Sequence, residues 1–174
     1  MNTHTVGPFN HSYISIVPNN QDKYKDDSRF STNSAGDRVA TVGAGPTGWG
    51  TTGTLASGLN RSRDADETLL NVEVIGLDFP GVEKSTMQED DMIDVMLDAE
   101  SRFDDSRFDY GGFPGLFGGQ NSNSFISGLL DFLGITPNKT PYTTPGWGTP
   151  VPSDSFETTK GDEENQSEED EGIQ

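Results

Sequence analysis

The sequence predicts an α+β fold, in which a small antiparallel sheet packs against two main helices and long loops rich in Gly and Pro connect the elements. Short β-patterned runs fill the first half of the chain, and two amphipathic helical runs follow them. Only 30% of the 174 residues are hydrophobic, and the chain contains 21 Gly and 10 Pro. We therefore expect a small core and a high proportion of loop.

Four segments in the first half have the pattern of β-strands. They are residues 11–17, 38–42, 55–60 and 68–75. In the first of these, alternation places Ile14 and Ile16 on one face and Tyr13 on the other. A polar loop with a turn near Gly36 connects the first two strands, and the glycine-rich stretch 43–50 is expected to be irregular or a β-bulged turn.

Two helices are expected in the second half. The first begins at Thr86, where Glu89 completes a capping box. Its apolar face is formed by Met92, Met96, Ala99 and Phe103. The second begins at Ser122 or Asn123 and ends at Leu133. Its buried side is formed by Phe125, Leu129, Phe132 and Leu133.

The length favours one domain, which we assign to residues 1–157. The proline-rich stretch 137–152 is predicted to be an extended coil that drapes over this domain, because a large aromatic such as Trp147 is unusual in a free linker. Residues 158–174 are strongly acidic and nearly devoid of apolar side chains, so they are predicted to be a disordered tail. His4 lies in an N-terminal segment that we expect to be flexible and solvated.

The net charge of −18 excludes several classes of partner. Nucleic acids and anionic membranes are bound by clustered Lys and Arg, which this chain lacks, so a cationic partner is favoured instead. The N-terminus lacks the pattern of a secretory signal, and no stretch has the roughly 20 apolar residues of a membrane span. We expect the chain to be cytoplasmic when made, with export as cargo or within a longer polypeptide left open.

Neither a metal site nor a cofactor is predicted. Without cysteine, the chain has no disulfide, no thiolate nucleophile and no cysteine-type zinc site. The run 43–45 has the glycines of a phosphate-binding loop, but no helix and no Lys or Arg follow it. Asp104, Asp105 and Asp109 lack the ligand spacing of an EF-hand.

The candidate site combines a helix start with one of only two histidines in the chain. A helix N-terminus offers unpaired N–H groups and a partial positive charge to a nucleophile such as Ser122, and His11 supplies a base. A second interpretation remains open from the residues alone. Ser and Asn are favoured N-caps, so the run 121–124 is also expected in a protein without any catalytic activity, and His11 can be purely structural.

Four runs resemble a known family. Residues 10–21, 40–46, 57–64 and 121–130 are similar to domains at the C-termini of Rhs-repeat and related bacterial polymorphic toxin proteins. Their layout resembles circularly permuted papain-like proteins of the NlpC and lecithin retinol acyltransferase type, over about residues 9–156. In that fold a histidine lies on an early strand, and a nucleophilic cysteine opens a later helix in an Asn-Cys-x-x-Phe pattern. Ser122 stands at the position of this cysteine.

The resemblance implies a hydrolase or acyltransferase that acts on an amide, peptide or ester bond as a bacterial toxin or effector. Ser122 would be the nucleophile, His11 the general base, and the helix N–H groups near Ser124 the oxyanion donors. Thr41 is the polar residue of the second strand that faces away from both valines, so we assign it as the group that orients the histidine. The residues assigned to binding or support of the site are Asn121, Ser124, Asn60 and Arg61.

The resemblance also implies a cognate immunity or carrier protein as partner. The alternative is an inactive module of the same fold, whose acidic surface engages a cationic protein, because serine is a poorer nucleophile than cysteine. In either case, packing the helix on the sheet predicts that His11 and the start of the 122–133 helix face each other across a cleft lined by residues 43–50.

Overall fold

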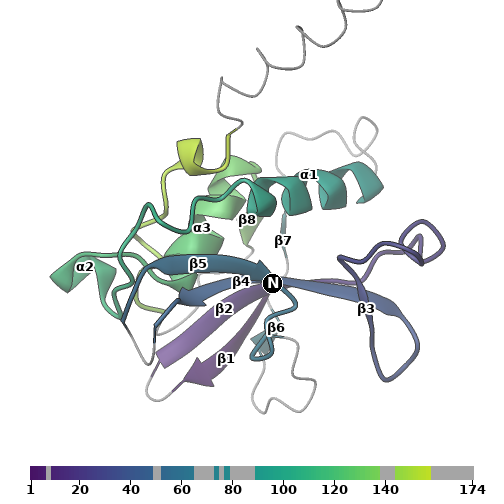
Figure 1. The fold of residues 1–174 in the computed structure, drawn as a ribbon, viewed down its shortest axis with the longest axis horizontal. Coiled ribbons are helices and arrows are strands. Elements are labelled where there is room, and N and C mark those ends of the chain that lie inside the picture. Colours follow the sequence, from purple (N-terminus) through teal and green to yellow (C-terminus); the bar gives the residue numbers. More distant parts are fainter. Residues whose placement is uncertain are drawn as a thin grey trace, which may run out of the picture.

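A sheet of short antiparallel strands, with two main helices on one of its faces, forms the body of the protein (Figure 1). The chain is thus α+β, as predicted. The computed structural model describes residues 1–6, 9–48, 52–64, 73–74, 77–78, 89–137 and 144–157. The predicted acidic tail 158–174, the helix start at Thr86 and most of the predicted strand 68–75 lie outside the described residues.

The main sheet has six strands, all paired antiparallel. The strands are β1 (Asn2–Val6), β2 (Phe9–Ile16), β3 (Ser31–Thr32), β4 (Arg38–Pro46), β5 (Leu55–Leu59) and β6 (Glu73–Val74). Their order is β3-β4-β2-β1-β6, and β5 also pairs with β4. A separate two-stranded sheet joins β7 (Leu77–Asp78) to β8 (Thr136–Pro137).

The short strands β3, β7 and β8 were not predicted, and β1 and β4 differ from the prediction over longer stretches. The N-terminal segment, expected to be flexible, forms β1 and pairs with β2 so that His4 stands opposite His11. It lacks apolar alternation, so the pairing with β2 rather than its own pattern determines its structure. Strand β4 continues to Pro46, beyond the predicted end at Val42, because β5 hydrogen-bonds to it over this stretch.

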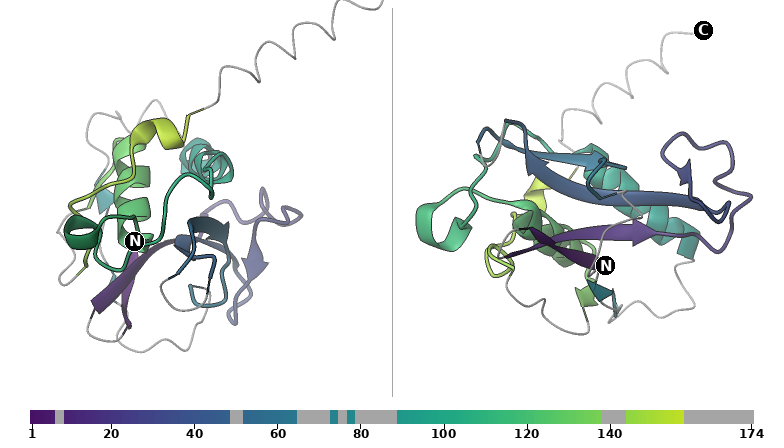
Figure 2. Two further views of the ribbon diagram at one scale, coloured as in Figure 1. Left: turned by 60° about the vertical axis from the view of Figure 1, so that its left-hand side comes forward. Right: turned by 90° about the horizontal axis from the view of Figure 1, so that it is seen from below.

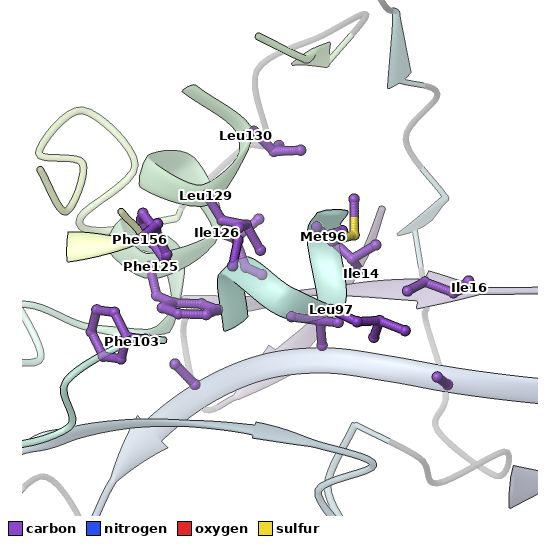
Figure 3. Close-up of a cluster of buried hydrophobic side chains, with 14 of the residues drawn as sticks. Ile14, Ile16, Met96, Leu97, Phe103, Phe125, Ile126, Leu129, Leu130 and Phe156 are labelled. Carbon is purple, nitrogen blue, oxygen red and sulfur yellow. The ribbon is translucent and has the colours of Figure 1, made fainter. Parts of the chain in front are cut away.

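Helices α1 (Glu89–Ser101) and α3 (Ser122–Phe132) cover the same face of the sheet (Figures 1 and 2). The predicted apolar face of the first helix is confirmed, with Met96, Ala99 and the following Phe103 buried. Ile14 and Val42 meet the helices from the sheet. Figure 3 shows the aromatic part of this core, where the rings of Phe103, Phe125 and Phe156 contact one another with centroids 5.0–5.6 Å apart.

The segment 144–157 lies along α3 and ends in a short 3₁₀ helix, η1 (Ser153–Ser155). The Val151 N–H donates to the Ser124 carbonyl at 3.0 Å, and the Ser127 hydroxyl donates to the Trp147 carbonyl at 2.8 Å. Gly128 permits this close approach, since a Cβ there would collide with the backbone of Val151. The described part of the proline-rich stretch therefore packs on the domain, as predicted.

Before α3, the chain makes a projecting turn around the short helix α2 (Pro114–Phe117) (Figure 1). Leu116 is 72% exposed and Phe117 is 80% exposed. Gly118 and Gly119, which follow, both have positive φ angles of 78° and 77°. These left-handed conformations let the chain reverse sharply and enter α3.

Glu100 is a buried carboxylate on α1 whose Oε1 accepts a hydrogen bond from the Ser57 hydroxyl at 2.8 Å. Burial raises the pKa of the Glu100 carboxyl above its ordinary value of 4.5; the hydrogen bond from Ser57 opposes this shift, and the charge of Asp105 adds to it. Because its pKa is higher in the folded state than in the unfolded state, the Glu100 carboxyl stabilises the fold when it is protonated. This contribution is fully present below the unfolded-state pKa and is lost as the pH rises through the folded-state pKa.

We therefore expect Glu100→Gln to raise the melting temperature by a few degrees near neutral pH, because the amide removes the buried charge and still accepts from Ser57. The gain should disappear as the pH falls toward the ordinary value of 4.5, where the wild-type carboxyl is itself protonated. Melting curves at several pH values measure this. Asp91→Asn, an exposed acid on the same helix, is the matched control and should show no such pH-dependent gain.

Candidate functional site

Ser122 and His11 lie in direct contact at the start of α3. The Ser122 Oγ and the His11 Nδ1 are 2.7 Å apart, although the two residues are separated by 111 positions in the sequence. His11 comes from β2 and is buried, with the ring of Tyr13 alongside it at 6.3 Å between centroids. The sequence prediction that this histidine faces the helix start is confirmed.

The other nitrogen of the imidazole contacts Asp64. His11 Nε2 and Asp64 Oδ1 are 2.7 Å apart, and the Asp64 side chain is only 1% exposed. An ionised carboxylate only accepts hydrogen bonds, so Nε2 carries the proton and donates it to Asp64. Nδ1 is then the unprotonated nitrogen and accepts from the Ser122 hydroxyl. The three side chains form a Ser-His-Asp relay.

A turn over the second face of the sheet places Asp64. The turn closes with the Asp64 N–H donating to the Arg61 carbonyl at 2.8 Å. Asn60, which has a positive φ of 50°, ties the turn to β4: its side-chain oxygen accepts from the Thr41 N–H, and its own N–H donates to the Thr41 carbonyl, both at 2.9 Å. Asn60 thus supports the site by holding the turn, rather than by binding.

Glycines in β4 make room for this turn. A Cβ at Gly43 would collide with the Asp64 carboxylate, and a Cβ at Gly45 would collide with the Arg61 guanidinium. Arg61 itself donates to the Ala56 carbonyl at 3.3 Å. The glycines expected to make this stretch irregular instead allow a regular strand to be covered closely by the turn.

Thr41 does not orient His11, so that assignment is wrong. It stands opposite Ser15 in the pairing of β2 with β4, and its hydroxyl makes no hydrogen bond within the described part of the chain. Asp64 takes the orienting position instead. Strand alternation led to Thr41 on β4. The carboxylate that contacts His11 instead comes from the 61–64 turn, which folds back over β4.

The N-cap of α3 is Asn121, not Ser122. The Asn121 side chain accepts hydrogen bonds from the N–H groups of Asn123 and Ser124, at 3.0 and 3.1 Å. The N–H groups of Asn123 and Ser124 are therefore already bonded, so of the predicted oxyanion donors near Ser124 these two are occupied by the cap. Ser124 has a structural part, since its hydroxyl donates to the Gly146 carbonyl at 3.1 Å. Capping by Asn121 leaves the hydroxyl of Ser122 available to His11.

Asn123 fixes the strand on either side of His11. Its side-chain oxygen accepts from the Ser12 N–H at 2.9 Å, and its amide nitrogen donates to the Asn10 carbonyl at 3.0 Å. A second hydrogen bond from this nitrogen reaches the Pro145 carbonyl, also at 3.0 Å. The residue after Ser122 therefore binds the backbone on both sides of His11, which fixes the position of His11 relative to Ser122. Sequence reasoning treated Asn123 only as a cap.

A cleft with a volume of about 220 Å³ opens beside the relay. It is lined by Asn10, His11, Arg63, Tyr110, Gly112, Phe113, Asn121, Ser122, Asn123 and Pro145. The cleft was predicted to be lined by residues 43–50, but none of the described residues of this stretch, 43–48, borders it. Residues 43–46 belong to β4. Connecting loops around residues 110–113 and 145 form the walls instead.

Tyr110 brings a hydroxyl close to Ser122. Burial raises the pKa of the Tyr110 phenol, while the charges of Arg63 and Arg61 and the neighbouring Ser122 side chain lower it, with a net upward shift. The phenol therefore stays protonated at neutral pH and can donate a hydrogen bond within the cleft. Nothing in the local sequence around Tyr110 distinguished it from a core aromatic.

Comparisons with known proteins give no assignment: no protein-family model, no curated protein and no solved structure matches this chain. Among the described residues, no group of three or more His, Asp or Glu side chains is arranged to hold a metal ion. Within the same ranges, none of the helices combines the length and apolarity that crossing a membrane requires.

Proposed function

We propose that this chain is a serine hydrolase or acyltransferase of the permuted papain-like type, acting on an amide, peptide or ester bond. The observation that carries the proposal is the buried relay from Ser122 Oγ through His11 to Asp64, with both contacts at 2.7 Å, at the edge of a cleft. A serine hydroxyl is not ionised at neutral pH, so it needs a base in hydrogen-bond contact, and this geometry provides one.

In the first step, His11 Nδ1 takes the proton of the Ser122 hydroxyl as the oxygen attacks the substrate carbonyl carbon. The imidazolium that forms is stabilised by Asp64, which is hydrogen-bonded to Nε2 and shielded from water. The imidazolium then protonates the leaving amine or alkoxide. Water, in a hydrolase, or another nucleophile, in an acyltransferase, attacks the acyl-Ser122 ester and releases the product.

The negative oxygen of the tetrahedral intermediate needs donors near Ser122. The Ser122 N–H is the first of α3 and is not one of the two N–H groups that Asn121 caps. It belongs to the residue that carries the nucleophile and lies at the positive end of the helix. We assign this N–H and the Tyr110 hydroxyl as the oxyanion donors.

The order of the elements supports the papain-like part of the proposal. The base lies on an early strand, the nucleophile opens a later helix, and a sheet separates the helix layer from the turn that carries the third residue. The setting in a bacterial toxin or effector is part of the same proposal and rests on the resemblance of the four sequence runs. Comparing bacterial growth upon cytoplasmic and periplasmic expression, for wild type and Ser122→Ala, tests this setting.

The chemistry itself is tested by labelling with a fluorophosphonate, which transfers its phosphonyl group to an activated serine hydroxyl with loss of fluoride. Mass spectrometry should find the modification on Ser122 and on none of the other serines, and His11→Ala should abolish it. If a folded wild-type protein is not labelled, the chain is the inactive binding module of the same fold.

Gly43→Ala should disrupt the relay without touching any of its three residues. The added methyl group occupies the place of the Asp64 carboxylate, so the orienting contact to His11 is displaced. We expect a fall of about 100-fold or more in kcat/KM for ester hydrolysis and a destabilisation of about 1–3 kcal/mol in urea unfolding. Gly148→Ala is the matched control, because a Cβ there meets no neighbouring atom. Equal activity of the two variants would contradict the role of Asp64.

A further inference from the structure

The described lining of the cleft beside Ser122 contains a cation and no acid, although the chain carries a net charge of −18. Of the described residues that line it, only Arg63 carries a permanent charge. The Asp64 carboxylate is bonded to the far side of the imidazole and is 1% exposed. In a protein with 29 acidic residues and only 11 Lys and Arg, this lining differs sharply from the average surface.

Arg63 is an exposed guanidinium that has no structural role in the described chain. Other cations are engaged within the fold: Lys23, Arg29 and Arg107 pair with aspartates, while Arg38, Arg61 and Arg102 donate to backbone carbonyls. No ion pair or hydrogen bond joins Arg63 to any residue that the structure describes. No described residue therefore occupies its donors, which face a ligand in the cleft that Arg63 lines.

Arg63 lines the same cleft as the Ser122 hydroxyl and lies near the Tyr110 hydroxyl. Its charge and that of Arg61 act on the Tyr110 hydroxyl, which lies close to the Ser122 side chain. The N-terminus of α3, whose Ser122 and Asn123 also line the cleft, adds partial positive charge. A negative group that a substrate carries next to its scissile bond would be stabilised by both.

We infer that the substrate bears a carboxylate near the scissile bond and that Arg63 binds it. This inference rests on the proposed function and adds its substrate class. The planar guanidinium offers two parallel N–H donors, which match the two oxygens of one carboxylate. No acid among the described lining residues competes for Arg63.

The experiment compares paired esters that differ only in charge. On the acyl side the pair is mono-4-nitrophenyl glutarate and 4-nitrophenyl pentanoate, and on the leaving-group side it is 3-acetoxybenzoate and 3-acetoxybenzamide. For at least one pair, the ratio of kcat/KM values should favour the carboxylate in wild type by about tenfold. Arg63→Gln should bring this ratio close to one, Arg63→Glu should reverse it, and Arg63→Lys should leave it intermediate.

Lys25→Gln is the matched control, because Lys25 is an exposed cation outside the cleft lining and its loss changes the net charge equally. Its selectivity ratio should equal that of wild type. Ester hydrolysis that depends on Ser122 but shows the same ratio with and without Arg63 would overturn the substrate assignment and leave the hydrolase proposal standing. If no ester is hydrolysed, the hydrolase proposal fails, and binding of glutarate to the Ser122→Ala protein decides the inference. Binding seen by NMR titration that Arg63→Gln weakens about tenfold supports a carboxylate site, whereas no binding, or binding independent of Arg63, overturns it.

Discussion

Replacing Ser122 by alanine should lower kcat/KM by about 10⁴-fold or more, because the acyl intermediate cannot form without the hydroxyl. Stability should change little. The N-cap is Asn121, so the substitution leaves the cap intact and removes the hydrogen bond to His11, worth about 1 kcal/mol. Hydrolysis of a 4-nitrophenyl ester and urea unfolding of the same preparation measure both quantities.

Ser127→Ala is the matched control for this result. Ser127 lies on the same helix and also loses one hydrogen bond, from its hydroxyl to the Trp147 carbonyl, when truncated. It should cost about 1 kcal/mol as well and keep the activity. Asn121→Ala, in contrast, should cost about 1–2 kcal/mol because it removes the cap. Wild-type activity in a folded Ser122→Ala protein would end the catalytic interpretation of this serine.

Asp64→Asn should lower kcat by about 10²- to 10⁴-fold with little change in KM. An asparagine can present its NH₂ group to His11 Nε2, which favours the imidazole tautomer with its proton on Nδ1. That proton points at Ser122 Oγ, so the imidazole can no longer act as a base. It also removes the buried negative charge that stabilises the imidazolium. Steady-state kinetics separate the two parameters.

Asp109→Asn controls for the loss of one acidic charge, because Asp109 is exposed and is not part of the cleft lining. Its kcat should match that of wild type. If Asp64→Asn behaves in the same way, Asp64 contributes only to structure, and His11 would act without an orienting carboxylate.

The encounter of His11 with Ser122 could be predicted from the sequence, since a histidine on a β-patterned run and a polar helix start are both local features. The partner on the far side of the imidazole could not. Asp64 ends the run Arg61-Ser62-Arg63-Asp64, whose charge is typical of a solvated loop, and no periodicity reveals that such a turn folds back over a strand. The alternating Gly43 and Gly45 were the available signal, because glycines within a strand mark close backbone approach.

The sequence predicted the elements whose hydrophobic pattern matches their packing in the core. It did not predict elements that form only because a neighbouring strand hydrogen-bonds to them. The helix faces of α1 and α3 follow from residues spaced by helical turns. Most of the predicted positions are buried, whereas Met92, Phe132 and Leu133 are partly buried. Strand β1 has no apolar alternation and exists because β2 offers it a hydrogen-bonding edge. The choice of Asn121 rather than Ser122 as cap also depended on tertiary contacts, since the Asn121 amide nitrogen donates to the Pro145 carbonyl at 2.8 Å.

The order of the relay along the chain has a consequence for the timing of biosynthesis. A ribosome releases the base and the orienting acid first, and the nucleophile only 111 residues after the base. Even then, the carbonyls that hold the helix start and the Asn123 side chain in place belong to Pro145 and Gly146. Under the proposed function, the domain therefore gains hydrolytic activity in one late step, when residues 144–157 have left the exit tunnel and docked on α3.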